Sequence, residues 1–159
     1  FTNRHGSHAI DTFKFFEQND CSQYDVIVLD PPAFAKHQNV KHNAVKGYKR
    51  LNAMALTAMK PGSLLFTFSC SQVVDSKLFY NTIMAAAIQT GRKVRVLHQV
   101  TQPADHPINI YHAESHYLKG LVLQIAAGAG NVTIGTSLTT IVTFDVLLAQ
   151  LAPANNGES

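Results

Sequence analysis

Two residues with chemically capable side chains follow two predicted buried strands. Asp30 follows the apolar run "YDVIVL" of residues 24–29, and Cys70 follows the run "SLLFTFS" of residues 63–69. Because neighbouring parallel strands end at the same edge of a sheet, about 5 Å apart, we expect this carboxylate and thiol to lie close together. A thiolate is a strong nucleophile when a cation or a helix N-terminus lowers its pKa. The pattern indicates nucleophilic catalysis, although a cysteine at a strand end is commonly just a small buried apolar residue.

The stretch "DPPAF", residues 30–34, forms a rigid turn at the end of the first strand. Prolines lack an N–H donor and fix φ, so the strand stops there. Phe34 offers a flat face on which a nucleobase can stack, worth about 1–3 kcal/mol per base. The alternative is that Phe34 fills an apolar pocket. Asp11 has two interpretations as well: it accepts hydrogen bonds from a nucleotide, or it caps the helix that follows.

A basic segment lies between Asp30 and Asp75, where the chain has no acidic residue. A segment of one charge sign next to a candidate site attracts phosphate groups. The alternative is a solvated helix face and loop. The cations of this segment are Lys36, Lys41, Lys46, Lys49, Arg50 and Lys60.

Composition favours a single globular α/β domain. The chain has 159 residues, of which 46% are hydrophobic and 14% charged, and its formal net charge is +3. The sequence has no uninterrupted run of about 18 apolar residues, so it predicts no membrane span. Two distant cysteines argue against a disulfide scaffold and fit a reducing cytoplasm. The histidines, including His112 and His116, do not form a convincing metal-binding pattern. A start at Phe1 without a leader leads us to expect a piece of a longer protein.

Strands alternate with helices along the chain, which predicts βαβ units and a mostly parallel sheet. A short strand end is expected at residues 8–11. Residues 126–144 carry no charge and are rich in glycine and threonine. From residue 126 onward we therefore expect a tail outside the domain, with an irregular hairpin and a short helix near "TFDVLLAQLA". The predicted helices cover residues 12–18, 44–59 and 75–90, and the further strands cover residues 24–29, 63–69, 93–100 and 116–125.

The stretches "YDVIVLDPPAFAK", "GYKRLNAMALTAMKPGSLLFTFSCSQ" and "DHPINIYHAESHYLKGLVLQI" together resemble the class I S-adenosylmethionine-dependent methyltransferases. More narrowly, the chain is similar to the 23S ribosomal RNA cytosine-C5 methyltransferase I family. The resemblance implies a partial Rossmann-like sheet, mostly parallel, with residues 116–125 as a terminal antiparallel strand. It makes residues 1–125 part of a catalytic domain that lacks the half with the cofactor's glycine-rich loop. The sheet should then expose an edge where another strand would pair.

The same resemblance implies roles for individual residues. Cys70 falls on the family's nucleophile, Asp30 and Pro31 lie beside the transferable methyl group and the target base, and Asp11 meets the cofactor's adenine. Their residue types, rather than the resemblance, make Phe34, Lys36, Lys49 and Arg50 the predicted contacts to ribosomal RNA. The implied cofactor is S-adenosylmethionine, with no metal and no membrane. The Cys70 thiolate would add to carbon 6 of cytosine and make carbon 5 nucleophilic enough to take the methyl group.

Three other interpretations stay open at this stage. A methyltransferase that modifies a nitrogen also uses a DPP-type loop but needs no thiol, so Cys70→Ala would leave it active. A module that only binds RNA through residues 36–50 would show affinity that falls steeply with salt and no cofactor binding. A truncated, inactive product is the third.

Overall fold

The computed structural model describes residues 6–34, 37–126 and 141–145 and shows a mixed five-stranded sheet in the order β3-β4-β2-β1-β5. Short 3-10 turns cover residues 21–23, 38–40 and 113–115. The helices are α1 (Thr12–Gln18), α2 (Lys41–Ala58) and α3 (Ser76–Thr90). The strands are β1 (Val26–Asp30), β2 (Leu64–Ser69), β3 (Val94–Thr101), β4 (Lys119–Ile125) and β5 (Ile141–Asp145).

Local signals fix the ends of α3 as the sequence predicts. The Asp75 carboxylate accepts a hydrogen bond from the backbone N–H of Leu78 at 2.7 Å and so caps the first turn. Gly91 ends the helix in the left-handed region at φ 65°, where a residue with a side chain is strained. In contrast, α2 begins at Lys41, earlier than predicted, because the 3-10 turn over residues 38–40 leads directly into it.

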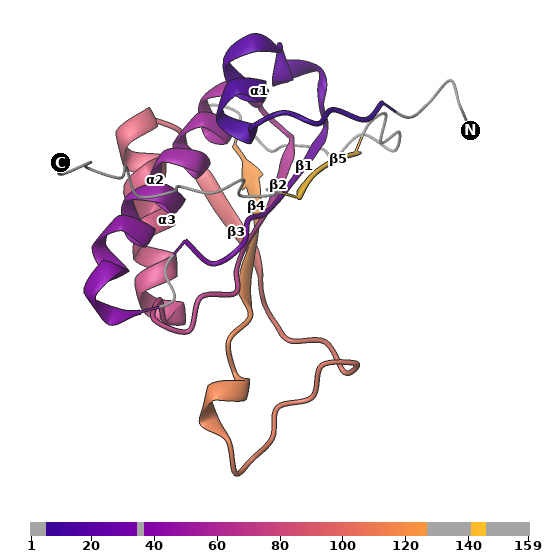
Figure 1. Cartoon of the computed structure of the whole chain (residues 1–159). Helices are drawn as coiled ribbons and strands as arrows, with labels where there is room; N and C mark the ends of the chain where they lie inside the picture. The colour runs from indigo at the N-terminus through magenta and orange to yellow at the C-terminus, as the bar shows by residue number, and fades with distance from the viewer. Residues whose placement is uncertain (1–5, 35–36, 127–140, 146–159) are drawn as a thin grey trace, which may run out of the picture.

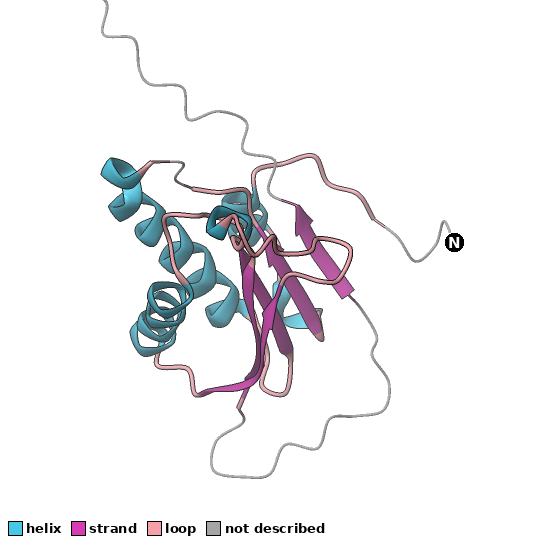
Figure 2. Ribbon diagram, turned by 90° about the horizontal axis from the view of Figure 1, so that it is seen from below, coloured by secondary structure: helices cyan, strands magenta, loops and turns pink. Residues whose placement is uncertain are grey.

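Helices α2 and α3 pack against one face of the sheet (Figures 1 and 2). Their apolar stripes meet the inward side chains of the strands, and each large side chain buried there contributes about 1.5–3 kcal/mol. None of the helices in the described ranges is long and apolar enough to span a membrane. The fully buried side chains of this core include Tyr48, Leu51, Leu56, Phe79, Ile27, Leu29, Leu65 and Leu123.

Strand β4 runs antiparallel, as expected, but it is not the terminal strand of the sheet. It pairs with β2 on one side and β3 on the other. Burial explains this order, because every residue of β4 is buried, whereas most of β3 is exposed. A strand buried along its whole length needs two neighbours, and the exposed β3 takes the edge. The remaining strands point one way, so the sheet is mostly parallel in direction.

Strand β5 occupies the edge of β1 that we expected to be exposed. It pairs with β1 in parallel along its whole length, from Ile141 opposite Val26 to Asp145 opposite Asp30. Five residues of the segment 126–159 therefore belong to the same sheet as residues 1–125, and residues 143–145 form a strand where we predicted the start of a helix. The rest of that segment, with the predicted hairpin, lies outside the described residues. With β1 flanked by β2 and β5, residues 8–11 form no strand.

Candidate active site

Asp30 is the last residue of β1, and Cys70 directly follows the adjacent parallel strand β2, so both residues lie at the same edge of the sheet. The register of β1 and β2 pairs Val28 with Phe66, which brings the two strand ends level. The Cys70 Sγ lies 3.9 Å from the Pro31 carbonyl oxygen, a contact that joins residues 39 apart in the sequence. Cys70 is half-buried and Asp30 is exposed. The thiol is thus beside the turn that carries the carboxylate, with access to solvent.

Burial, hydrogen bonds and nearby charges shift the pKa of the Cys70 thiol in opposite directions. Burial raises the pKa of Cys70 above its ordinary value, and the nearby Asp30 carboxylate raises it further. Backbone N–H groups of Cys70 itself and Ala33 lower it, as does the ammonium of Lys119. The thiol therefore stays protonated at neutral pH in this environment, and a neighbouring cation becomes important for ionising it.

Lys119 belongs to this site, although we did not single it out from the sequence. It is the first residue of β4, it is only 8% exposed, and its Nζ donates a hydrogen bond to the Ser71 carbonyl at 2.5 Å. A signal was available, because "YLKGLVLQI" places a lysine within an otherwise apolar strand. Lysine is almost never buried without a partner, so such a position points to a specific contact.

Phe34 packs into the molecule beside the site. Its ring meets the Tyr48 ring edge to face, with centroids 4.7 Å apart. One face of Phe34 lies against Gly47 of α2, where an added Cβ would come within 3.1 Å of the ring. These contacts fit the interpretation of Phe34 as a residue that fills an apolar pocket. Base stacking on it stays a prediction.

Asp11 is the N-cap of α1, so the structure agrees with the interpretation of this residue as a helix cap. Its carboxylate accepts a hydrogen bond from the backbone N–H of Lys14 at 3.1 Å. The capping carboxylate is exposed. A contact with a cofactor's adenine stays a prediction.

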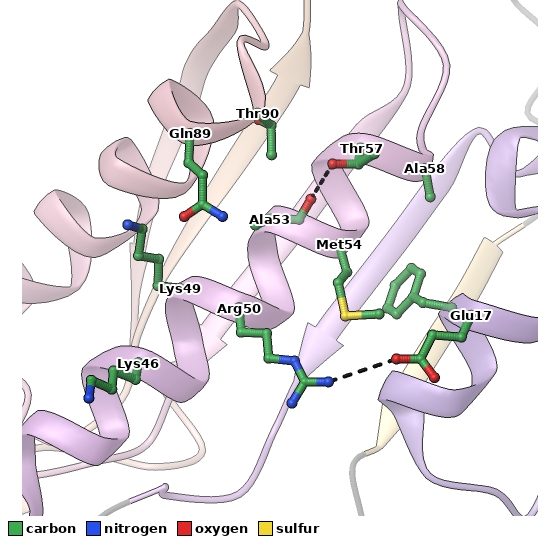
Figure 3. Close-up of a pocket in the computed structure, with 11 residues that line it drawn as sticks. Glu17, Lys46, Lys49, Arg50, Ala53, Met54, Thr57, Ala58, Gln89 and Thr90 are labelled. Carbon is green, nitrogen blue, oxygen red and sulfur yellow. Dashed lines mark hydrogen bonds and ion pairs between the residues drawn. The ribbon is translucent and has the colours of Figure 1, made fainter.

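The predicted RNA-binding cations lie on the outer side of the helices. Lys49 and Arg50 line a groove of about 680 Å³ between α1, α2 and α3, together with Lys46 (Figure 3). Arg50 also pairs with Glu17 at 3.8 Å and lies over the Phe13 ring at 4.5 Å. None of the residues that line this groove is Asp30, Phe34 or Cys70. Lys36 lies outside the described residues.

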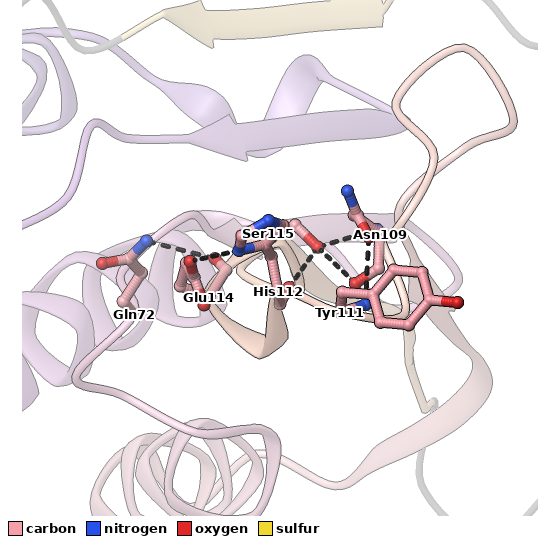
Figure 4. Close-up of polar contacts among 6 residues, drawn as sticks. All are labelled: Gln72, Asn109, Tyr111, His112, Glu114 and Ser115. Carbon is pink, nitrogen blue, oxygen red and sulfur yellow. Dashed lines mark hydrogen bonds and ion pairs between the residues drawn. The ribbon is translucent and has the colours of Figure 1, made fainter.

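A long loop between β3 and β4 starts at the edge of the sheet where Cys70 lies, because Thr101 pairs with Lys119 and Lys119 with Ser69. The loop projects beyond the sheet (Figure 1). The Gln72 side chain donates to the Glu114 carbonyl at 3.1 Å and ties the loop to the segment after Cys70 (Figure 4). At its tip, Ile110 and Tyr111 are each 88% exposed.

The fold is similar to part of the fold of two solved proteins. SMU.776, described as a candidate methyltransferase and solved with SAH, matches 73% of this chain and 30% of its own, with a TM-score of 0.58 and 22% identity. TTHA0409 from Thermus thermophilus, described as a candidate DNA modification methylase, matches 78% of this chain and 55% of its own, with a TM-score of 0.51 and 12% identity. No family model matches the chain.

Among proteins of similar sequence, the chain is a homologue of ribosomal RNA large subunit methyltransferase I. The Shewanella denitrificans protein of that name is 40% identical over 120 residues, which are 74% of this chain and 30% of the relative. The protein of the same name from Tolumonas auensis is 43% identical over 102 residues, or 64% of this chain and 26% of the relative. The chain thus spans less than a third of the length of these relatives.

Proposed function

We propose that this chain takes part in methylating carbon 5 of a cytosine in ribosomal RNA, with Cys70 as the covalent nucleophile and Asp30 as its acidic partner. The observation that carries the proposal is the contact of the Cys70 sulfur with the Pro31 carbonyl, which holds the thiol beside the turn that Asp30 begins. The homology to ribosomal RNA large subunit methyltransferase I supports the reaction class and the substrate. Two free cysteines fit a cytoplasmic protein that acts on ribosomal RNA.

S-adenosylmethionine is the proposed methyl donor, and it supplies the methyl group on a positively charged sulfur. The residues at the end of β1 fit such a group, because Asp30 presents an exposed carboxylate next to the buried Pro31. A carboxylate attracts a cationic sulfonium. Asp11, the exposed N-cap of α1, is the proposed contact of the adenine.

Residues of this chain are proposed to carry out the steps at the cytosine ring. The Cys70 thiolate forms a bond to carbon 6, and the electron pair of the C5–C6 double bond makes carbon 5 nucleophilic. Asp30 would have to be protonated when the cytosine is bound, because the ring nitrogen is an acceptor; its carboxyl then donates a hydrogen bond to that nitrogen and stabilises the negative charge that develops there during the addition. After the methyl group has moved to carbon 5, a base removes the proton there and the carbon–sulfur bond breaks. Cysteine suits both halves, as a good nucleophile and a good leaving group.

Lys49 and Arg50 are the proposed contacts for the RNA backbone. They line the groove along α2 with Lys46, and no acidic residue occurs in the sequence between Asp30 and Asp75. Phosphate contacts of this kind position a nucleic acid without reading its sequence. Lys36 and Phe34 are proposed to contact the RNA nearer the target base, with the Phe34 ring stacking on a base.

A mechanism-based trap tests the proposal. In RNA that carries 5-fluorocytidine, the fluorine at carbon 5 blocks the final elimination, so the adduct with Cys70 accumulates. We expect the wild-type chain, mixed with large-subunit ribosomal RNA of this kind and S-adenosylmethionine, to form a denaturant-resistant complex. Peptide mapping should place the RNA on Cys70.

Two variants separate the proposal from its alternatives. Cys70→Ala should form no adduct, whereas Cys21→Ala removes the other, buried thiol and should form it normally. Methyl transfer that persists in Cys70→Ala would instead indicate a nitrogen target. RNA binding without cofactor binding, in a chain that forms no adduct, would indicate a module that only binds RNA.

A further inference from the structure

Lys119 contacts the residues on either side of Cys70, one through its backbone and the other through its side chain. Its backbone pairs with Ser69, the residue before Cys70. Its Nζ donates to the carbonyl of Ser71, the residue after Cys70, at 2.5 Å. Lys119 and Ser71 are buried, with exposed fractions of 8% and 0%. The turn that carries the thiol is therefore held from both ends by one lysine of the neighbouring strand.

No carboxylate neutralises this lysine by direct contact. Among the described residues, the ion pairs within 4.0 Å do not include Lys119. Two titratable groups act on the pKa of Lys119: the Cys70 thiol and the carboxylate of Asp75, the N-cap of α3. A buried ammonium without a contacting carboxylate is costly, because burial penalises charge. Its position is thus explained only partly by the hydrogen bond to Ser71.

We propose that Lys119 is a positioning residue whose ammonium fixes the Cys70–Ser71 turn and places a positive charge beside the sulfur when the sulfur is ionised. This inference deepens the proposed function and rests on it. The thiol needs such a charge, because burial and the Asp30 carboxylate both oppose the thiolate. Tyr48, buried below the site on α2, is a neutral phenol and supplies no counter-charge.

One attraction, between the Lys119 ammonium and the Cys70 thiolate, acts on the pKa of both groups. Burial lowers the pKa of Lys119, and the Cys70 thiolate raises it. The Lys119 ammonium in turn lowers the pKa of Cys70. Coupling between two groups must act equally in both directions, so either group can report on the other.

The first test measures the pKa of the Cys70 thiol in the complete chain. The rate of alkylation by iodoacetamide is followed against pH, and mass spectrometry quantifies the Cys70 peptide separately from that of Cys21. Lys119→Met should raise the pKa of Cys70 and slow alkylation at neutral pH, by about tenfold for each pKa unit. Lys119→Arg, which keeps the charge, should restore most of the rate. Lys93→Met, an exposed lysine before β3 at the opposite end of the sheet, should leave the rate unchanged.

An unchanged Cys70 pKa in folded Lys119→Met would overturn the inference, since a purely structural lysine does not shift the thiol titration. If that variant does not fold, the reciprocal measurement decides. The pKa of Lys119 is read by NMR of ¹³C-methylated lysines in the wild-type chain and in Cys70→Ser, where a neutral hydroxyl replaces the thiol. We expect the pKa of Lys119 to fall in Cys70→Ser, and an equal pKa in both chains would overturn the inference.

Neither measurement needs a cofactor or RNA, so a failure of this inference can be distinguished from a failure of the proposed function. Thiol–ammonium coupling without adduct formation would overturn the proposed function, although the coupling itself would be established. Adduct formation at a normal rate in Lys119→Met, with an unchanged pKa of the Cys70 thiol, would overturn this inference and leave the proposed function standing.

Discussion

Phe34 and Tyr48 meet edge to face at an interplanar angle of 85°, and this contact joins the turn after β1 to the middle of α2. Tyr48 in turn meets Phe79 of α3 at 5.6 Å and 87°. A chain of three aromatic rings therefore runs from the candidate active site into the helical layer. Offset and edge-to-face pairs of this kind add about 0.5–1.5 kcal/mol to the burial of the rings themselves.

Removal of the Tyr48 ring should be far more costly than removal of its hydroxyl. The side chain is 0% exposed, so Tyr48→Ala leaves a cavity and should lower the free energy of unfolding by about 3–5 kcal/mol. The hydroxyl lies near Ser69 and the backbone of Phe34 but makes no well-formed hydrogen bond to any described residue. Tyr48→Phe should therefore change the stability by less than about 1 kcal/mol. Urea unfolding of both variants measures the difference, and a large loss in Tyr48→Phe would show that the hydroxyl has a partner.

Asp30→Asn should make the Cys70 thiol more reactive even though it removes the proposed acidic partner. The Asp30 carboxylate raises the pKa of Cys70, so a neutral amide lowers that pKa and increases the thiolate fraction at neutral pH. Alkylation of Cys70 at pH 7 should be faster than in the wild-type chain, while adduct formation with RNA should be lost. Asp105→Asn is the control, because Asp105 is exposed and is not among the groups that shift the pKa of Cys70 or Lys119. Slower alkylation in Asp30→Asn would contradict the electrostatic account.

The two interpretations of Asp11 predict different results for two substitutions. As the N-cap of α1 it stabilises the chain, so Asp11→Ala should cost about 1 kcal/mol, while Asp11→Ser retains the cap and costs little. If Asp11 also contacts the cofactor, both variants should bind S-adenosylmethionine more weakly in calorimetric titrations. Wild-type affinity in Asp11→Ser would leave capping as the function of this residue.

The sequence predicted those features that depend on local chemistry. Asp75 and Gly91 delimit α3 because a side-chain cap and a left-handed residue act within one helical turn. The proximity of Asp30 and Cys70 followed from the rule that parallel strands end together. The order of β3 and β4 was not predictable in this way, because it depends on how much of each strand is buried in the folded sheet. The pairing of β5 with β1 was missed for a related reason, since the short run "IVTFD" of residues 141–145 does not by itself show which strand it pairs with.

Gly120→Ala should destabilise the sheet by overpacking it. An added Cβ on Gly120 of β4 would lie 2.4 Å from the Phe68 ring and 2.9 Å from a methyl group of Val100, on the two neighbouring strands. Strain of this kind costs about 1–3 kcal/mol, which urea unfolding resolves. Phe68→Leu in the same chain removes the ring and should relieve part of the strain, so the double variant should lose less than the sum of the two single losses. Strict additivity would show that the ring is not the obstacle.

Arg92 should stabilise the C-terminal end of α2 from outside that helix. Its Nε donates to the Leu56 carbonyl at 2.8 Å, and its Nη2 donates to the Met59 carbonyl. The last carbonyls of a helix have no partner within it, so a guanidinium that reaches two of them satisfies groups that would otherwise be unpaired. Hydrogen bonds from charged donors contribute about 1.5–3 kcal/mol each, and Arg92→Met should lower the free energy of unfolding by at least that amount.

Two comparisons isolate the forked contact of Arg92 from its charge. Arg92→Lys keeps the charge but offers a single ammonium, so we expect it to recover less than half of the loss. Lys93→Met removes the charge of the next residue, which is exposed, and should change the stability by less than about 0.5 kcal/mol. Urea unfolding, followed by circular dichroism at constant pH and salt, gives all three values. Full recovery in Arg92→Lys would mean that the positive charge near the helix end, rather than the bonds to two carbonyls, stabilises α2.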